Sequence, residues 1–410
     1  MAGYIQKIKT KIPFSSREVE IDLQGKNLIL TGGNGCGKTQ LLNHLDHDLQ
    51  LRIVKKQNPD LQEVKDGIEY WRSKRNTKNK ASSEYDFYNK NLNDSIKELE
   101  EARNSPFTID QLEQFVIRYD ENKALCIKFE ANRQANITCP QAASSKESLK
   151  QKDTKNKNST VELFEEYLVS HKTAQAYAES SIDNNPTEAR NIKEWFDKLE
   201  TDLRELFEDQ TLELKFDSGK QAFFIKQDKK DLYRFQQLSS GFSSILSIYA
   251  DLLTKVELRS ISPEEIDGVV LIDEIDAHLH VSLQRKIFAF LDKSFPKVQF
   301  IVTTHSPFVV SSVNDAVIYD LSRLEQVDDL SMYSYESVLE GLFNVLPISE
   351  ILKNKITEMS QIAVSDSPDV TKLEALVIDV SQHESKLDEE SAYFLKSAKL
   401  VVSKAKNKGN

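Results

Sequence analysis

Four of the chain's 12 glycines lie between residues 32 and 37, so one short loop needs backbone freedom that the rest of the chain avoids. The apolar run Asn27–Thr31 before this loop is typical of a buried strand. Four leucines follow the loop at the spacing of one helix face: Leu41, Leu42, Leu45 and Leu49. Only 12 glycines and 10 prolines occur among 410 residues, which excludes collagen-like, linker-dominated and disulfide-rich scaffolds and favours long helices.

The loop reads GGNGCGKT over residues 32–39 and matches the pattern G-x-x-x-x-G-K-[ST]. In such a loop the backbone N–H groups point inward and, with the N-terminal end of the following helix, capture an anion. Lys38 can reach the β- and γ-phosphates of a nucleotide, and Thr39 can offer its hydroxyl to Mg²⁺. The predicted nucleotide-binding residues are Gly32, Asn34, Gly35, Cys36, Gly37, Lys38 and Thr39.

A second pattern consists of the apolar run Val269–Ile272 followed by two acids, Asp273 and Glu274. In α/β proteins, the carboxyl ends of parallel strands are where ligands bind. Asp273 is therefore predicted to hold Mg²⁺ together with Thr39. Glu274 is predicted to orient or deprotonate an attacking water.

Two further patterns, at Ser239 with Gly241 and at His305, are weak evidence of a functional site when each is taken alone. Ser239 and Gly241 precede a helix that contains Ile245, and small residues at a helix N-terminus are usually ordinary caps. His305 follows the apolar run Val298–Val302, and a lone histidine at a strand end is usually structural. The strand–helix–strand order of this region favours parallel pairing.

Taken together and in this order, the four motifs resemble those of an ABC-type ATPase of the RecF, SMC and OLD-like branch. The resemblance implies an α/β fold: a P-loop head with a mixed sheet and flanking helices, which carries helical insertions and a helical C-terminal region. It implies ATP and Mg²⁺ as cofactors. It also assigns the Walker A role to Lys38 with Thr39 and the signature role to Ser239 with Gly241. Asp273 with Glu274 takes the Walker B role, and His305 the switch role.

The resemblance also implies that ATP is held between two head-to-tail protomers, with Ser239 of one protomer facing the nucleotide bound by Lys38 of the other. A homodimer or a larger even homo-oligomer follows. The glutamine loop of this family should come after the strand at 124–129, where Gln134 is the candidate.

Two departures separate the chain from transporter subunits. The signature reads LSSGF, whereas the transporter form is LSGGQ. The residues after Glu274 read IDAHLH, which is similar to OLD-like ATPases.

These patterns predict a head interrupted by insertions. The head comprises 1–45, the strand and glutamine loop at 124–140, and 211–320. We expect helical insertions at 46–123 and 161–210, a flexible loop at 141–160, and a helical C-terminal region at 321–410.

The composition limits the partners and the compartment. With 54 basic and 65 acidic residues the net charge is −11, so the chain is not a general nucleic-acid coat. Local contact with nucleic acid stays open, because residues 71–80 and 146–157 are rich in basic side chains. The three cysteines follow no paired or metal-binding spacing, which predicts a reducing compartment and therefore a cytoplasmic protein. The lack of a long apolar stretch predicts that the chain has no membrane segment.

Three functions compete at this point. The sequence resembles the ATPase subunits of two-gene phage-defence systems, first PARIS-like and then Septu or retron-associated, which predicts an ATPase that controls a separately encoded effector, a nuclease or toxin. A RecF-like DNA-repair ATPase is the alternative. A self-contained OLD-type nuclease is disfavoured, because after residue 320 the chain has only Asp328 and Asp329 in a polar loop where a Toprim domain needs a strand-end Glu and Asp-x-Asp.

Overall fold

The computed structural model describes the chain except for residues 1–2, 58–60, 81, 104, 141, 153–158, 182, 314, 328–334, 344–348, 366–368, 385–386, 388 and 409–410. Asp328 and Asp329, considered above for a nuclease site, lie outside the described residues. The chain divides into two compact units, Met1–Val338 and Leu339–Asn410.

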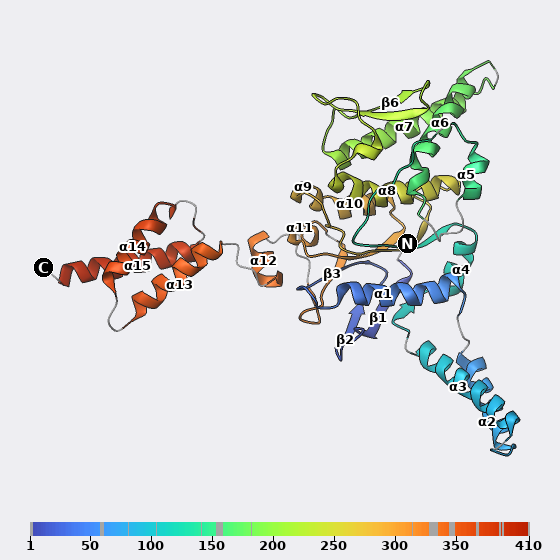
Figure 1. Cartoon of the computed structure of the whole chain (residues 1–410), viewed down its shortest axis with the longest axis horizontal. Helices are drawn as coiled ribbons and strands as arrows, with labels where there is room; N and C mark the ends of the chain where they lie inside the picture. The colour runs from blue at the N-terminus through green and yellow to red at the C-terminus, as the bar shows by residue number, and fades with distance from the viewer. Residues whose placement is uncertain are drawn as a thin grey trace. The chain divides into compact units, whose positions relative to one another are not determined.

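A six-stranded sheet forms the centre of the first unit (Figure 1). Its strand order is β11-β10-β3-β9-β8-β5. Its strands are β3 (Asn27–Thr31), β5 (Ala124–Phe129), β8 (Asp267–Ile272), β9 (Val298–Thr303), β10 (Ala316–Asp320) and β11 (Glu325–Val327). Neighbouring strands run parallel, except that β11 is antiparallel to β10. β8 and β9 are buried along their whole length, as expected of parallel strands with helices on both faces. This arrangement confirms the predicted α/β fold class.

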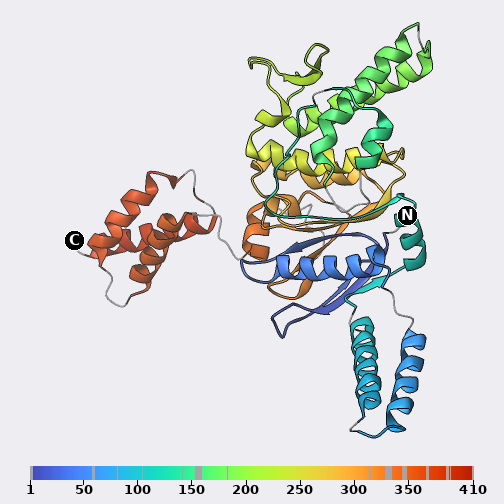
Figure 2. The same cartoon turned by 45° about the vertical axis from the view of Figure 1, so that its right-hand side comes forward.

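Different helices cover the two faces of this sheet (Figures 1 and 2). On one face, Leu41 and Leu45 pack in an apolar core with alternate sheet residues such as Leu30 and Val269. The helix that carries these leucines lies between the large sheet and a three-stranded antiparallel sheet of order β2-β1-β4. The covering elements are α1 (Lys38–Leu49), β1 (Ile5–Lys11), β2 (Glu18–Asp22) and β4 (Phe107–Ile109) on this face, and α8 (Ser240–Leu258) and α10 (Ile287–Ser294) on the other.

Two long helices, α2 (Leu61–Asn76) and α3 (Ser83–Arg103), lie side by side as a hairpin (Figure 2). They share a small apolar cluster built on Val64, Ile68 and Leu92, separate from the core of the head. The predicted helical insertion thus has its own packing.

The remaining elements of the first unit are shorter or belong to the second insertion. They are α4 (Leu112–Asp120), α5 (Lys146–Lys152), α6 (Phe164–Glu179), α7 (Pro186–Phe207), β6 (Glu213–Asp217), β7 (Ala222–Lys226), α9 (Val281–Gln284), α11 (Pro307–Val310) and helical turns at Gln50–Val54, Val161–Leu163 and Phe235–Gln237. α12 (Tyr335–Phe343) spans the division between the two units.

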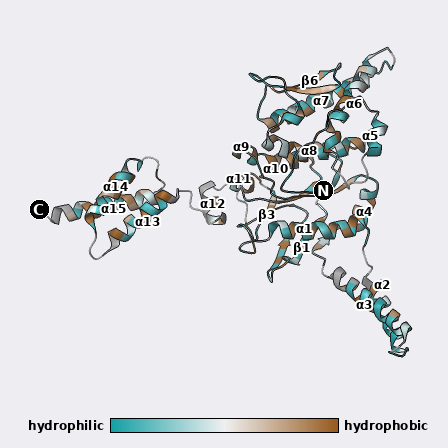
Figure 3. Ribbon diagram, viewed as in Figure 1, coloured by the Kyte–Doolittle hydropathy of each residue, from teal (hydrophilic) through white to brown (hydrophobic). Residues whose placement is uncertain are grey.

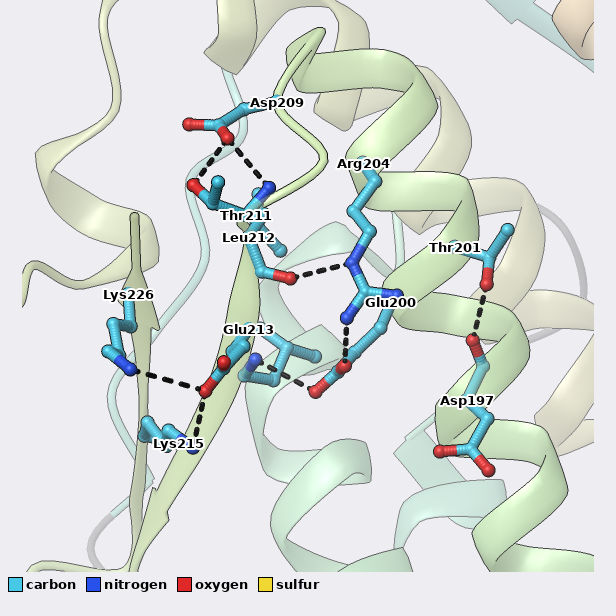
Figure 4. Close-up of polar contacts among 11 residues, drawn as sticks. Asp197, Glu200, Thr201, Arg204, Asp209, Thr211, Leu212, Glu213, Lys215 and Lys226 are labelled. Atoms are coloured by element: carbon cyan, nitrogen blue, oxygen red, sulfur yellow. Dashed lines mark hydrogen bonds and ion pairs between the residues drawn. The ribbon is translucent and has the colours of Figure 1, made fainter. Parts of the chain in front are cut away.

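Helix α7 holds the β6–β7 hairpin through two side chains (Figure 4). Arg204 Nε donates a hydrogen bond to the carbonyl of Leu212 at 2.8 Å, and Glu200 Oε1 accepts one from the N–H of Leu214 at 2.9 Å. Arg204 and Glu200 also pair with each other at 2.9 Å. These bonds fix the start of β6 on the helix.

The buried carboxylate of Glu165 connects this hairpin to the segment that enters α8. It accepts hydrogen bonds from the N–H of Phe223 at 3.0 Å, from Arg234 Nη2 at 3.0 Å and from Gln236 Nε2 at 2.7 Å. A buried carboxylate needs such partners to offset its lost hydration. The N-terminus of α8 is therefore placed by the second insertion.

The second unit is a three-helix arrangement of α13 (Glu350–Val364), α14 (Val370–Ser381) and α15 (Glu389–Lys408). Its helices mix hydrophobic and hydrophilic residues along their length (Figure 3), and their inward positions form an apolar core that includes Met359, Leu373 and Leu395. No helix in the described part of the chain is long and apolar enough to cross a membrane.

The structure differs from the sequence prediction in three segments. The helical insertion at 46–123 also contains β4, which pairs with β1, because Phe107 is buried in the core. The predicted flexible loop at 141–160 contains α5, whose Leu149 is fully buried. The predicted helical region at 321–410 begins with β11, whose backbone extends the large sheet. Three-residue strands and a single buried leucine give too little periodicity to be recognised from sequence.

Candidate functional site

The glycine loop connects β3 to α1, as predicted, and its backbone has the conformation that glycine permits. Gly32, Gly35 and Gly37 have φ angles of 133°, 74° and 102°. A Cβ atom on Gly37 would lie 2.6 Å from Ile12 Cγ2, so this position excludes side chains by space as well as by backbone angle. Asn34 and Gly35 are exposed at the crest of the loop, and Cys36 is half-buried.

Lys38 is buried at the first turn of α1 and its ammonium group folds back on the loop. Nζ donates to the carbonyls of Gly32 at 2.8 Å and Gly33 at 3.1 Å, and lies 3.7 Å from Cys36 Sγ. It also lies 3.4 Å from His305 Nδ1. Burial lowers the pKa of Lys38. These carbonyls therefore hold the ammonium group against the loop.

His305 is half-buried just after β9 and faces this lysine. Burial, and next the charge of Lys38, lower the pKa of His305 below its usual 6.5. A neutral imidazole with its proton on Nε2 would accept the Lys38 hydrogen bond at Nδ1. The predicted loop and the predicted strand-end histidine are thus brought together by the adjacent strands β3 and β9.

Asp273 receives two threonine hydroxyls from neighbouring elements. Thr39 Oγ1 lies 3.2 Å and Thr303 Oγ1 2.6 Å from Asp273 Oδ1. A carboxylate and a hydroxyl are hard oxygen ligands of the kind that Mg²⁺ prefers beside phosphate oxygens. The donor set of Thr39 and Asp273 therefore fits the predicted metal.

Glu274 follows Asp273 in a left-handed backbone conformation, with φ of 45°. Its N–H donates to Thr303 Oγ1 at 2.7 Å. Such a φ is uncommon outside glycine and persists only where neighbouring contacts hold it. Its side chain is only partly buried, so the carboxylate is accessible at the edge of the sheet.

The contacts that hold this turn come from Arg133, a residue that the sequence reasoning passed over. Nη1 donates to the carbonyl of Asp273 at 2.8 Å, and Nη2 donates to those of Glu274 at 3.1 Å and Ile275 at 3.0 Å. Burial lowers the pKa of Arg133 to about 10. Gln134, the predicted glutamine-loop residue, is the next residue along and is exposed; its role stays a prediction.

Ser239 and Gly241 lie at the N-terminus of α8, and Ser239 is exposed. A Cβ atom on Gly241 would lie 2.8 Å from the carbonyl oxygen of His278, so the loop packs closely on the segment after Glu274. In the part of the chain that the structure describes, neither residue forms a hydrogen bond to the glycine loop of the same chain.

Ser322, which contacts the loop, and Phe14, an exposed residue in the turn after Ile12, gave no recognised sequence signal. Ser322 Oγ accepts the N–H of Gly33 at 2.8 Å, and its own N–H donates to Asp320 Oδ1 at 2.7 Å. Phe14, two residues beyond Ile12, is 99% exposed. The apolar run of β10 that ends in Asp320 could have indicated a further strand end at the site, because Asp320 pairs with Thr31 in register.

A model of the family described as "AAA domain, putative AbiEii toxin, Type IV TA system" matches residues 28–311, a range that contains each motif of the site. The chain is 37% identical over 158 residues to "Retron Ec83 probable ATPase" of Escherichia coli, a match that covers 36% of this chain and 29% of the relative. It is 31% identical over 222 residues to "Septu protein PtuA" of Bacillus thuringiensis, covering 52% of this chain and 51% of the relative.

These curated relatives confirm the resemblance inferred from the motifs, and the chain spans about half of their length or less. Among solved structures, the Smc head bound to the C-winged helix domain of ScpA is similar with a TM-score of 0.37 and 14% identity. That match covers 77% of this chain and 93% of the Smc head.

Replacing Arg133 with leucine should destabilise the protein, because it leaves the carbonyls of Asp273, Glu274 and Ile275 without their buried donor. We expect a loss of roughly 2–4 kcal/mol in the free energy of unfolding. Thermal unfolding followed by circular dichroism measures it. Gln134→Leu, one residue away and exposed, is the matched control and should leave the melting temperature unchanged. Equal melting temperatures for the two variants would contradict the role of Arg133.

Proposed function

The chain belongs to the AAA domain family whose model matches residues 28–311, and on that premise we propose that it binds and hydrolyses ATP. The observation that carries the proposal is the convergence of Lys38, Thr39, Asp273 and His305 within hydrogen-bonding distances. These groups come from the loop and from two strands, and they supply the cation, the hydroxyl and the carboxylate that phosphoryl transfer uses.

In this mechanism the loop N–H groups bind the phosphates and Lys38 exchanges its carbonyl partners for the β- and γ-phosphates. Thr39 and Asp273 would hold Mg²⁺, which neutralises the charge that develops on the phosphates. Glu274 orients or deprotonates the attacking water, and His305 contacts the γ-phosphate side of the site. We propose that the exposed ring of Phe14 stacks on the adenine, because it lies in the turn after Ile12, whose side chain approaches Gly37 of the loop.

Lys38→Ala should abolish ATP binding, because it removes the cation that the loop carbonyls present. Glu274→Gln should keep ATP binding but slow hydrolysis by about 10²–10⁴-fold, since the amide cannot accept the proton of the water. Binding of a fluorescent ATP analogue and release of phosphate measure the two steps. Wild-type turnover by Glu274→Gln would show that this carboxylate does not act on the water.

We also propose that two protomers form the complete site head-to-tail. Ser239 is exposed at the N-terminus of a 19-residue helix, where the helix dipole favours an anion, and it forms no hydrogen bond to the described loop residues of its own chain. A second copy can bring this terminus to the γ-phosphate.

Mixing two inactive variants tests this arrangement. Lys38→Ala lacks the loop cation but keeps Ser239, whereas Ser239→Arg keeps the loop but blocks the helix terminus. A mixed dimer has one site with both parts intact, so ATP hydrolysis should reappear on mixing. The two variants assayed separately are the controls. Activity that stays at the level of the separate variants argues that Ser239 does not act in trans.

For the biological role, we propose an ATPase subunit in anti-phage defence that controls a separately encoded effector, a nuclease or toxin. The relatives named for a retron and for Septu support this, and so does the sequence resemblance to two-gene defence ATPases. A RecF-like repair ATPase remains the alternative, and a self-contained nuclease is disfavoured for the reason given above.

The isolated chain should hydrolyse ATP without cutting nucleic acid. Purified protein incubated with Mg²⁺, ATP and plasmid or single-stranded DNA should leave the DNA intact on a gel. The Lys38→Ala protein, purified in the same way, controls for contaminating nucleases. Cleavage by the wild-type chain that Lys38→Ala lacks would overturn the effector proposal.

A further inference from the structure

The tip of the α2–α3 hairpin carries a positive charge that contrasts with the rest of the chain. Its basic side chains all come from residues 71–80: Arg72, Lys74, Arg75, Lys78 and Lys80. This stretch contains no acid, whereas the whole chain has a net charge of −11. Glu84 and Asp86 follow in the first turn of α3, where acids stabilise the helix dipole, and Glu84 pairs with Lys78 at 2.6 Å.

Aromatic rings from both helices lie among these basic residues. Trp71 contacts Tyr70, Phe87 and Tyr88 at ring-centroid distances of 4.8, 6.5 and 6.2 Å. Tyr70 is 50% and Phe87 59% exposed, and neither belongs to the apolar cluster that holds the hairpin together. Lys74 Nζ lies 5.6 Å from the centre of the Tyr70 ring. Both rings pack on Trp71, yet each of the two residues keeps half or more of its surface exposed.

The basic residues of the β6–β7 hairpin offer a contrast within the same molecule (Figure 4). Lys215 and Lys226 both pair with the carboxylate of Glu213, at 2.5 and 3.5 Å. Lys220 pairs with Asp217 at 3.6 Å. Here each of the three lysines pairs with a neighbouring acid, whereas Arg72, Lys74 and Lys80 of the α2–α3 tip are exposed and lie in a stretch without acids.

We propose that the tip of the α2–α3 hairpin binds single-stranded nucleic acid, with bases stacked on Tyr70 and Phe87 and phosphates paired with Arg72, Lys74 and Lys80. Exposed aromatic rings beside cations suit unpaired bases, because every base offers a flat face for stacking and a phosphate nearby. A duplex hides its base faces and would use only the cations. An acidic peptide without apolar or aromatic side chains would likewise leave the two rings without a partner.

Binding is measured on the full chain without nucleotide, by the fluorescence anisotropy of a labelled single-stranded oligonucleotide of mixed sequence. Tyr70→Leu/Phe87→Leu keeps apolar side chains but removes both rings, and should weaken binding by about tenfold or more. Tyr70→Phe/Phe87→Tyr keeps the rings and should bind like the wild type. Arg72→Gln/Lys74→Gln should weaken binding and reduce its dependence on salt.

Two control variants and a competition assay complete the test. Lys215→Gln/Lys226→Gln removes an equal number of positive charges, two, from the β6–β7 hairpin, and this variant should bind the oligonucleotide normally. Lys38→Ala should also bind normally, which separates this surface from the ATP site. The proposal is overturned if the leucine variant binds like the wild type, if the two glutamine variants lose affinity equally, or if polyglutamate displaces the oligonucleotide as well as unlabelled oligonucleotide does.

Discussion

The site depends on one buried carboxylate, that of Asp273. Its Oδ1 accepts hydroxyl hydrogen bonds from Thr303 at the end of β9 and from Thr39 in the first turn of α1. Its backbone N–H donates to the carbonyl of Phe129 at the end of β5, at 2.9 Å. A carboxylate at 2% exposure needs the two hydroxyl partners to offset its lost hydration. Together with the backbone bond to Phe129, they connect the ends of β5, β8 and β9 to the start of α1.

Around this carboxylate the turn at Glu274 is held by Arg133, whose guanidinium reaches three consecutive carbonyls. The planar guanidinium has several N–H donors in fixed directions and can therefore bind three carbonyls at once. The compact ammonium group of a lysine could not span these three carbonyls. The backbone that carries the accessible carboxylate of Glu274 is thus constrained by Thr303 at its N–H and by Arg133 at its carbonyl. Preorganised groups of this kind lower the reorganisation needed during a reaction.

Much of the site was predictable from local sequence. The strand at Asn27–Thr31, the glycine loop and α1 were expected from consecutive residues, and so were the strands before Asp273 and His305. Arg133, Ser322 and Phe14 were not. Arg133 binds backbone carbonyls 140 or more residues away, and carbonyls leave no trace in a residue pattern. Phe14 is distinguished only by its exposure in the turn between β1 and β2, and exposure depends on the tertiary structure around that turn.

The sequence by itself determined the loop, because a strand, a glycine-rich turn and a helix follow from backbone sterics and from hydrophobic spacing over neighbouring residues. Only the tertiary structure decided which side chains meet there. Thr39 and Asp273 are 234 residues apart, and β9 lies between the strands that carry the loop and the acid. Strand order and register result from many weak packing contacts summed over the whole sheet, and for this reason no short motif specifies them.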